Sequence, residues 1–226
     1  MKILALDTST SACSVAICNG AEIIETSKIA PRQHNELLLK MLDSILAEAG
    51  LNLSKLDGLA FGCGPGSFTG LRIAAGVIQA MAFAHDLPVV PISTLRTLSQ
   101  CAYREVQAQY VLPALDAVMG EIYWGCYHLN SENIMVSLQE EIICKPQDIQ
   151  ADKEHAWVGI GDGWDLYSAM MSEKIGVENV SQVLLQHFPL ARDMIPLAQY
   201  DFEAGKAVSA EKALPVYLRD ELYKKS

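Results

Sequence analysis

Residues 62–73 read Gly62-Cys63-Gly64-Pro65-Gly66-Ser67-Phe68-Thr69-Gly70-Leu71-Arg72-Ile73. Four glycines fall within nine residues, between an apolar segment over 56–61 and a second one that continues to about Ala84. Glycine is needed where the backbone takes a positive φ or approaches another group closely, and the hydroxyl of Ser67 or Thr69 can cap a following helix. The pattern predicts a strand, a tight turn and a helix. The N-terminus of such a helix can bind an anion, so a phosphate-facing loop and a purely structural turn both remain open.

Two named phosphate motifs are excluded at this turn. A Walker A loop requires a lysine that residues 62–73 do not contain. The dinucleotide fingerprint requires Gly-x-Gly-x-x-Gly and an acidic residue about 20 positions later. Gly62 and Gly64 are followed by Ser67, and the next apolar segment, 87–90, carries no acid.

The composition indicates a globular chain of one large or two small domains. The chain has 226 residues, of which 50% are hydrophobic, and a net charge of −10. The acidic balance argues against an extended nucleic-acid groove, which requires a basic face. The six cysteines are scattered without a Cys-x-x-Cys pair, which is typical of a reducing compartment. No signal peptide or membrane-length apolar run is recognised, so we expect a cytoplasmic protein without a membrane partner.

The first residues predict a β-hairpin with a polar turn. Lys2–Leu6 is an apolar strand, Asp7-Thr8-Ser9-Thr10 supplies a carboxylate and hydroxyls, and Asn19-Gly20 indicates a second reversal of the chain. The polar turn could hold phosphate or the water of a magnesium ion. The alternative is an Asx or Ser turn that satisfies its own backbone.

Two long helices are predicted in the first half of the chain, before a shorter one over Leu95–Tyr103. Over Gln33–Ala49, one apolar stripe recurs at helical spacing and consists of Leu38, Met41, Leu42, Ile45 and Ala49. The helix over Gly70–Ala84 is apolar almost all round and must be buried on more than one side. One side would cover a sheet, and the second would meet either another chain or neighbouring helices of this chain.

The start of the chain is echoed in its second half. Val111–Asp116 repeats the pattern of Ile3–Asp7, an apolar strand that ends in Asp, 109 residues later, and Glu121–Tyr127 echoes the second strand. This repetition suggests a duplicated domain. The polar segment Glu105–Gln109 marks the expected boundary, which gives an N-terminal domain over 1–105 and a smaller C-terminal domain over 106–226.

Two Asp-terminated hairpins, each followed by helices, resemble the actin/hexokinase/Hsp70-like (ASKHA) architecture, an α/β fold of duplicated domains with mixed sheets flanked by helices. Within it, the chain is similar nearly end to end to the TsaB (YeaZ) family. The segments that carry this similarity are Asp7-Thr8-Ser9-Thr10, Gly64-Pro65-Gly66-Ser67-Phe68-Thr69-Gly70-Leu71-Arg72, Ile92-Ser93-Thr94-Leu95, Asp116-Ala117 with Met119-Gly120-Glu121-Ile122-Tyr123, and Pro215-Val216-Tyr217-Leu218-Arg219.

The resemblance implies a non-catalytic subunit. Its partner would be TsaD, which transfers threonylcarbamoyl to N6 of adenosine 37 in ANN-decoding tRNAs. The histidines that hold the metal of TsaD correspond to Thr94 and Leu98 here, and no two of the five histidines have i, i+4 spacing, so no metal is expected. The family usually has Arg at the position of Val118, which weakens the Asp116–Glu121 hairpin as a nucleotide site.

The resemblance also implies further partners and candidate sites. It implies the TsaE ATPase as a third partner of the complex, a homodimer when TsaD is absent, tRNA contact only through the complex, and ATP or ADP at a partner interface. The loops that could face this nucleotide contain Asp7, Thr8, Ser9, Thr10, Gly64, Pro65, Gly66, Ser67 and Thr69. The candidates for the partner interface are Leu39, Leu46, Arg72, Ala75, Ile78, Gln79 and Ala82.

Two other functions remain as alternatives. A stand-alone small-molecule kinase of ASKHA type would require two competent phosphate hairpins and a catalytic carboxylate, for which Asp7 and Asp116 are available. A metallopeptidase would require the histidine pair that this sequence lacks.

Overall fold

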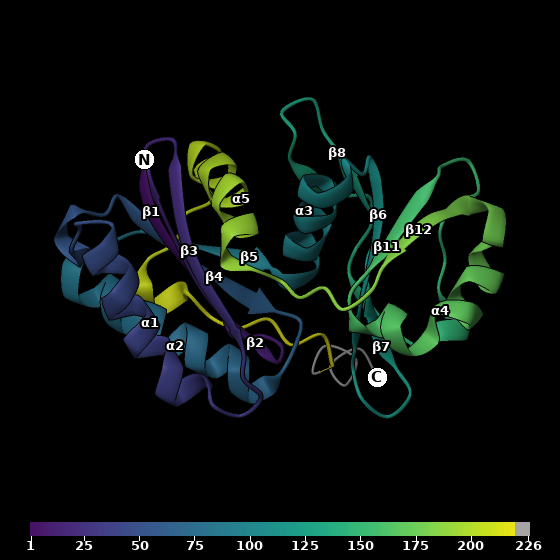
Figure 1. Cartoon of the computed structure of the whole chain (residues 1–226), viewed down its shortest axis with the longest axis horizontal. Helices are drawn as coiled ribbons and strands as arrows, with labels where there is room; N and C mark the ends of the chain where they lie inside the picture. The colour runs from purple at the N-terminus through teal and green to yellow at the C-terminus, as the bar shows by residue number, and fades with distance from the viewer. Residues whose placement is uncertain (220–226) are drawn as a thin grey trace. The chain divides into compact units, whose positions relative to one another are not determined.

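The strands form two sheets in two separate units, in a computed structural model that describes residues 1–219 (Figure 1). Unit 1 contains Met1–Thr97 and Pro189–Val216. Unit 2 contains Leu98–Phe188 and, among the described residues, 217–219. Each unit carries a mixed α/β arrangement, as the sequence predicts.

The sheet of unit 1 is built around β1, whose two neighbours run in opposite senses. The hairpin partner β2 is antiparallel to β1, and β3 is antiparallel to β2. On the other side, β4 and then β5 are parallel to β1. The strand order is β3 (Glu22–Ile29), β2 (Ala12–Asn19), β1 (Lys2–Asp7), β4 (Gly58–Gly64) and β5 (Val89–Ser93).

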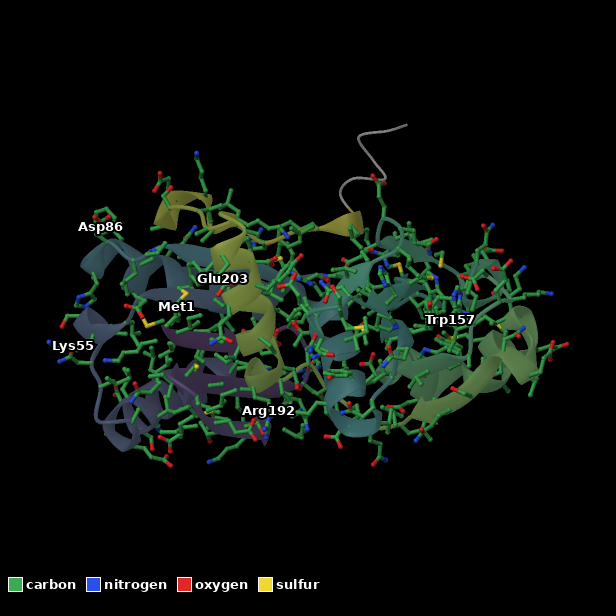
Figure 2. The ribbon with its side chains drawn as sticks, turned by 90° about the horizontal axis from the view of Figure 1, so that it is seen from above. Met1, Lys55, Asp86, Trp157, Arg192 and Glu203 are labelled. Atoms are coloured by element: carbon green, nitrogen blue, oxygen red, sulfur yellow. The ribbon has the colours of Figure 1, made fainter. Side chains whose placement is uncertain are left out.

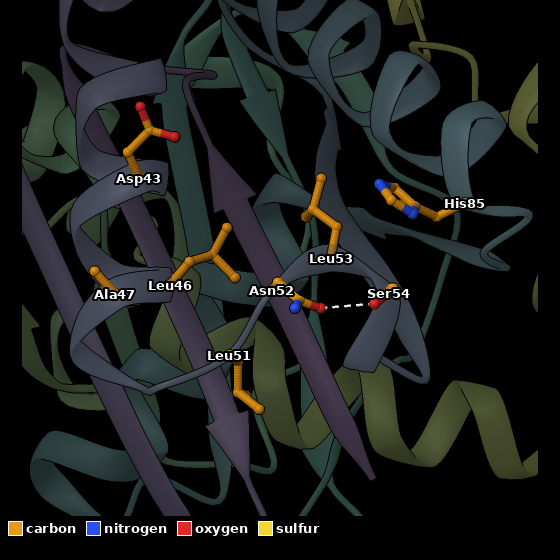
Figure 3. Close-up of a pocket in the computed structure, with 8 residues that line it drawn as sticks. All are labelled: Asp43, Leu46, Ala47, Leu51, Asn52, Leu53, Ser54 and His85. Atoms are coloured by element: carbon orange, nitrogen blue, oxygen red, sulfur yellow. Dashed lines mark hydrogen bonds between the residues drawn. The ribbon is translucent and has the colours of Figure 1, made fainter.

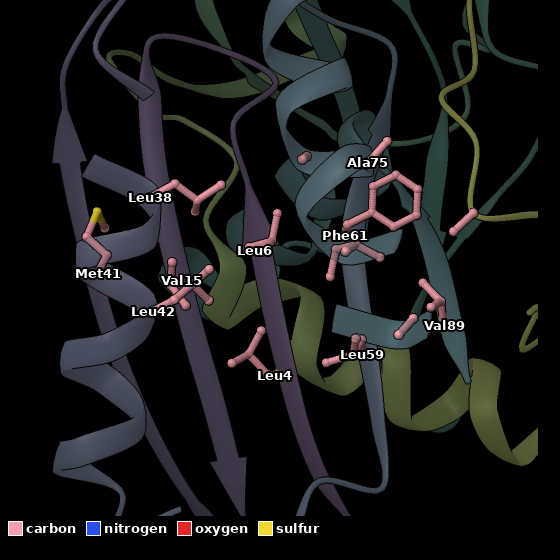
Figure 4. Close-up of a cluster of buried hydrophobic side chains, with 14 of the residues drawn as sticks. Leu4, Leu6, Val15, Leu38, Met41, Leu42, Leu59, Phe61, Ala75 and Val89 are labelled. Carbon is pink, nitrogen blue, oxygen red and sulfur yellow. The ribbon is translucent and has the colours of Figure 1, made fainter. Parts of the chain in front are cut away.

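Helices α1 (His34–Glu48) and α2 (Phe68–His85) share one apolar core with this sheet. The predicted stripe of α1 is confirmed at Leu38, Met41, Leu42 and Ile45, which are buried, whereas Ala49 lies just beyond the helix and is half-buried. Figure 4 shows Leu38, Met41 and Leu42 of α1 against Leu4 and Leu6 of β1 and Val15 of β2, with Ala75 of α2 beside Phe61 of β4.

Helix α5 (Ala191–Glu203) packs on β1, β2, β4 and β5. The Ser14 hydroxyl accepts the N–H of Ala191 at 2.9 Å, where α5 begins. Farther along the chain, the backbone of Val208 pairs with Val89. The chain from Pro189 to Val216 therefore belongs to unit 1.

The division of the chain differs from the predicted boundary after residue 105. The sequence predicts a single domain over 106–226, because the return of α5 to the first sheet has no local sequence signal. The boundary also falls earlier, inside helix α3 (Thr94–Val106). The Gln100 side chain of α3 donates to the carbonyl of Asn133 and accepts from the N–H of Met135, which ties it to unit 2.

The sheet of unit 2 repeats the order of unit 1. Its first strand, β6, has an antiparallel neighbour, β7, and a parallel neighbour, β11, as β1 has β2 and β4. Beyond them, β10 is antiparallel to β7 and β12 is parallel to β11. The strand order is β10 (Ile142–Cys144), β7 (Ile122–Trp124), β6 (Tyr110–Asp116), β11 (Trp157–Ile160) and β12 (Val180–Leu184). This matching topology confirms the duplicated architecture.

Three details of unit 2 differ from the expectation. The single strand predicted over Glu121–Tyr127 is two strands, because β7 pairs with one end of β6 and β8 (Tyr127–Leu129) pairs with the other. Strand β8 continues into a ladder with β9 (Met135–Ser137). Strand β12 was not predicted. From Gly161–Trp164 we expect a turn and from Asp165–Met171 a helix, whereas helix α4 (Asp162–Ile175) already starts at Asp162 and covers a core that contains Trp124 and Trp164.

Candidate functional site

The polar turn after β1 and the Gly-rich loop after β4 lie against each other in unit 1. The N–H of Ser67 donates to the carbonyl of Ser9 at 2.7 Å. The Thr8 hydroxyl donates to the carbonyl of Gly70 at 2.8 Å. Because β1 and β4 are parallel neighbours, their carboxyl ends meet at one edge of the sheet. The fold therefore brings together the two segments that sequence reasoning selected separately.

The glycines of this loop make room for the chain's own turn. A Cβ on Gly70 would lie 1.9 Å from the Thr8 carbonyl oxygen, and one on Gly66 would lie 2.5 Å from the Ser9 carbonyl oxygen. A Cβ on Gly62 would lie 1.8 Å from Oδ2 of Asp7. The contacts of Gly66 and Gly70 are with backbone carbonyls and lie far below any ordinary Cβ contact, so these two positions require glycine. These glycines allow residues 7–9 of the same chain to approach the loop closely, as expected for a purely structural turn.

The carboxylate of Asp7 lies inside unit 1, where the turn after β1 meets the Gly-rich loop. It is fully buried, and its Oδ1 accepts the backbone N–H and the hydroxyl of Ser9 at 2.8 and 2.7 Å. Its Oδ2 has no hydrogen-bond partner among residues 1–219. Burial raises the pKa of Asp7 to about 7, and the two hydrogen bonds from Ser9 oppose that rise.

Exposure divides the candidate loop residues. Asp7, Thr8, Ser9, Gly64 and Pro65 are buried, and Thr10 and Gly66 are half-buried. Only Ser67 and Thr69 are exposed, at the N-terminus of α2, where the Ser67 hydroxyl accepts the N–H of Gly70 at 3.3 Å. The buried carboxylate cannot face a ligand in this geometry. Among the candidate loop residues, only Ser67 and Thr69 are therefore openly accessible to a ligand in unit 1.

The second Asp-terminated hairpin, in unit 2, is held by different contacts. Oδ1 of Asp116 accepts the N–H of Val118 at 3.0 Å, and Oδ1 of Asp162 accepts the N–H of Asp116 at 2.8 Å. Burial raises the pKa of Asp162. Val118, which takes the place of the family's arginine, is 66% exposed and has a φ of 62°, which is unusual for a β-branched residue.

Sequence reasoning assigned no role to Arg219, which contacts this hairpin. Its guanidinium donates to the Ala117 carbonyl at 2.7 Å and to Oε2 of Glu121 at 2.8 Å. The only available signal was a basic residue near the end of a conspicuous Pro-Val-Tyr-Leu-Arg segment. The arginine stabilises the hairpin from the C-terminal side of the chain.

The seven interface candidates separate into core and surface residues. Ala75, Ile78 and Ala82 have at most 4% of their surface exposed and belong to the core of unit 1, so these three side chains do not reach its surface. Gln79 is half-buried, and its amide donates to the carbonyl of Ala213 at 3.1 Å. The remaining candidates reach the surface to different extents, and they are Leu39, Leu46 and Arg72.

The accessible side of helices α1 and α2 carries large apolar groups. Leu39 is 57% exposed, Phe68 53% and Phe83 84%. The Arg72 guanidinium lies over the Phe68 ring, 3.7 Å from its centroid. We call Leu39, Leu46, Phe68, Arg72 and Phe83 the α1–α2 surface. Isolated apolar residues on a surface are common, but large aromatic and leucine side chains on two adjacent helices are typical of a contact site.

The described residues do not form a metal centre of the TsaD type. Thr94 and Leu98, at the positions that correspond to the paired histidines, are both buried. Residues 1–219 contain no group of three or more His, Cys, Asp or Glu side chains that could hold a metal ion. Among the helices of this described part, none is both long and apolar enough to span a bilayer.

Two sheets of equal strand order, each with a first strand that ends in Asp, define a protein of the ASKHA-like class. A family model described as "TsaD: tRNA N6-adenosine threonylcarbamoyltransferase" matches residues 21–183. The chain is 40% identical to the tRNA threonylcarbamoyladenosine biosynthesis protein TsaB of Escherichia coli, over 98% of this chain and 96% of the relative. It is 37% identical to the protein of that name from Haemophilus influenzae, over 98% and 95% of the two chains.

A solved structure gives the same assignment. The chain is similar to YeaZ from Pseudomonas aeruginosa with a TM-score of 0.90 and 42% identity, over 96% of this chain and 99% of that one. The chain belongs to the TsaB (YeaZ) family, whose curated relatives are named for tRNA threonylcarbamoyladenosine biosynthesis.

Proposed function

We propose that this chain is a non-catalytic subunit that pairs with TsaD and supports threonylcarbamoyl transfer to N6 of adenosine 37 in ANN-decoding tRNAs. The observation that carries the proposal is the α1–α2 surface, which presents leucine and aromatic side chains on a unit whose buried turn offers no reactive group. Large apolar and aromatic residues with an arginine are the composition that interface cores favour. The names of the curated relatives support the pathway.

The same surface would serve a homodimer when TsaD is absent, because one self-complementary patch can meet either a copy of itself or a related fold. ATP or ADP would then require residues from a partner, since Asp7 is turned into unit 1. TsaE would be a further partner of the complex, and tRNA would contact this chain only through the complex. A cytoplasmic location agrees with six free cysteine thiols.

Replacing Leu39 by glutamate is expected to weaken the complex with TsaD. A charge placed on an apolar contact must be desolvated, and changes at central interface residues cost about 2 kcal/mol or more, or at least roughly thirtyfold in Kd. The measurement is a titration of TsaD from the same organism, together with size-exclusion chromatography and light scattering of the mixture.

The matched control for this variant is Leu166→Glu, since Leu166 of α4 is 58% exposed in unit 2 and Leu39 is 57% exposed in unit 1. We expect the control to bind TsaD as the wild type does. Equal losses of affinity for TsaD in Leu39→Glu and Leu166→Glu would argue against a specific contact at the α1–α2 surface. The absence of any complex between the wild-type chain and TsaD would contradict the proposed function itself.

A further inference from the structure

A hollow of about 580 Å³ lies beside the C-terminal ends of α1 and α2 in unit 1. Its apolar lining comes from Leu46, Leu51 and Leu53, which are half-buried. Figure 3 shows these leucines between Asp43 on one side and His85 on the other, with the Ser54 hydroxyl donating to the Asn52 side chain at 2.7 Å. The hollow therefore combines an apolar floor with a polar rim.

The electrostatics of this hollow favour a cation. Helix α1 ends at Glu48 without a basic residue in its last turn, whereas the last turn of α2 carries the basic residue His85, which lines the hollow opposite Asp43. The C-terminal end of each helix carries a partial negative charge of about half an elementary charge. The Asp43 carboxylate adds a full charge and forms no ion pair within residues 1–219, although α1 also contains Lys40 and the short helix Leu53–Lys55 ends in a lysine.

We propose that this hollow receives a lysine or arginine side chain of the partner subunit, with the aliphatic stem on the leucines and the cation at Asp43. Basic side chains bury their methylene groups along apolar surfaces while the charged end meets an anion or water. Leu46 belongs both to the hollow and to the α1–α2 surface, so the two are continuous. The inference thus rests on the proposed function and adds to it a specific, charge-dependent anchor.

Asp43→Asn is the first test, with TsaD from the same organism as the titrated partner. Loss of a partly desolvated charge pair is expected to weaken binding about tenfold at low salt, and the difference should shrink as salt rises. Glu48→Gln is the matched control, because it removes an exposed acid from the same helix outside the hollow. We expect its Kd to stay within about twofold of the wild type.

Ala47→Lys tests the hollow independently of Asp43. Ala47 is exposed on α1 and lines the hollow, so a lysine there would supply the chain's own cation and occupy the space. We expect this variant to bind TsaD at least as poorly as Asp43→Asn, while its circular dichroism and thermal unfolding stay unchanged.

The possible failures are distinguishable. If the wild type binds TsaD and Leu39→Glu disrupts binding, but Asp43→Asn and Ala47→Lys bind normally, the inference is overturned and the proposed function stands. If only Ala47→Lys weakens binding, the occupant is apolar and the cation assignment is wrong. If Asp43→Asn changes the light-scattering mass of the chain alone but not its affinity for TsaD, the occupant is a second copy of this chain, which also overturns the inference.

Discussion

Replacing Gly70 by alanine is expected to destabilise unit 1 severely, by at least about 3 kcal/mol, because overpacking against fixed backbone is among the costliest single changes. The new Cβ would lie 1.9 Å from the carbonyl oxygen of Thr8. The hydroxyl of Thr8 in turn donates a hydrogen bond to the Gly70 carbonyl. The contact can be relieved only if the turn after β1 separates from the start of α2. Urea unfolding followed by circular dichroism would measure the loss.

Helix α2 supplies its own control at Gly76. A Cβ there would meet nothing within 4 Å. Alanine is the better helix former by about 0.8–1 kcal/mol, so Gly76→Ala is expected to raise the free energy of unfolding by up to that amount. Similar unfolding midpoints for Gly70→Ala and Gly76→Ala would contradict the close packing of the loop on the turn.

The free energy of unfolding is expected to fall as the pH rises from about 4 to about 7, because of Asp7. Burial raises the pKa of Asp7 from 3.8 to about 7 in the folded chain. Between these values the folded state holds a proton that the unfolded state has released, so raising the pH favours unfolding. Above pH 7 Asp7 is ionised in both the folded and the unfolded state. The folded state then bears the full cost of burying the charged carboxylate, of the order of 2–4 kcal/mol.

Asp7→Asn is expected to remove this part of the pH dependence. The asparagine oxygen can still accept the two hydrogen bonds from Ser9, but the side chain does not titrate. Urea midpoints at pH 4.5, 6 and 8 should decline for the wild type and stay flatter for the variant. Asp162, whose pKa burial also raises, is present in both proteins, so the difference between the two curves isolates Asp7. Parallel curves would show that Asp7 is ionised throughout.

Much of the fold follows from short-range patterns. The apolar runs before Asp7 and Asp116 predict both central strands, because a buried strand flanked by turn residues needs no long-range information to be recognised. Strand β12 was missed because only Leu184 of its five residues is buried, so the segment carries a weak apolar signal. The return of α5 to the first sheet is a long-range event that no local pattern encodes.

The candidate site shows the same limit at the level of single residues. The spacing of glycines in 62–70 predicts close approach but does not say to what. In the structure, Gly62, Gly66 and Gly70 approach the turn after β1, and Gly64 approaches the carbonyl of Val216. In α2, nearly every side chain is apolar, so helical periodicity could not separate the buried Ile78 from the exposed Phe83. Only the packed sheet determines which side of such a helix is inside.

The discontinuity of unit 1 has a consequence for the order in which the chain folds as it is synthesised. The strands of unit 2 all precede Pro189, so its sheet can form while the ribosome is still adding residues. The sheet of unit 1 is made earlier but lacks α5 until the segment Pro189–Val216 has left the exit tunnel. The nascent chain therefore carries an incompletely covered apolar sheet until α5 has emerged, although this sheet is the first of the two to be made.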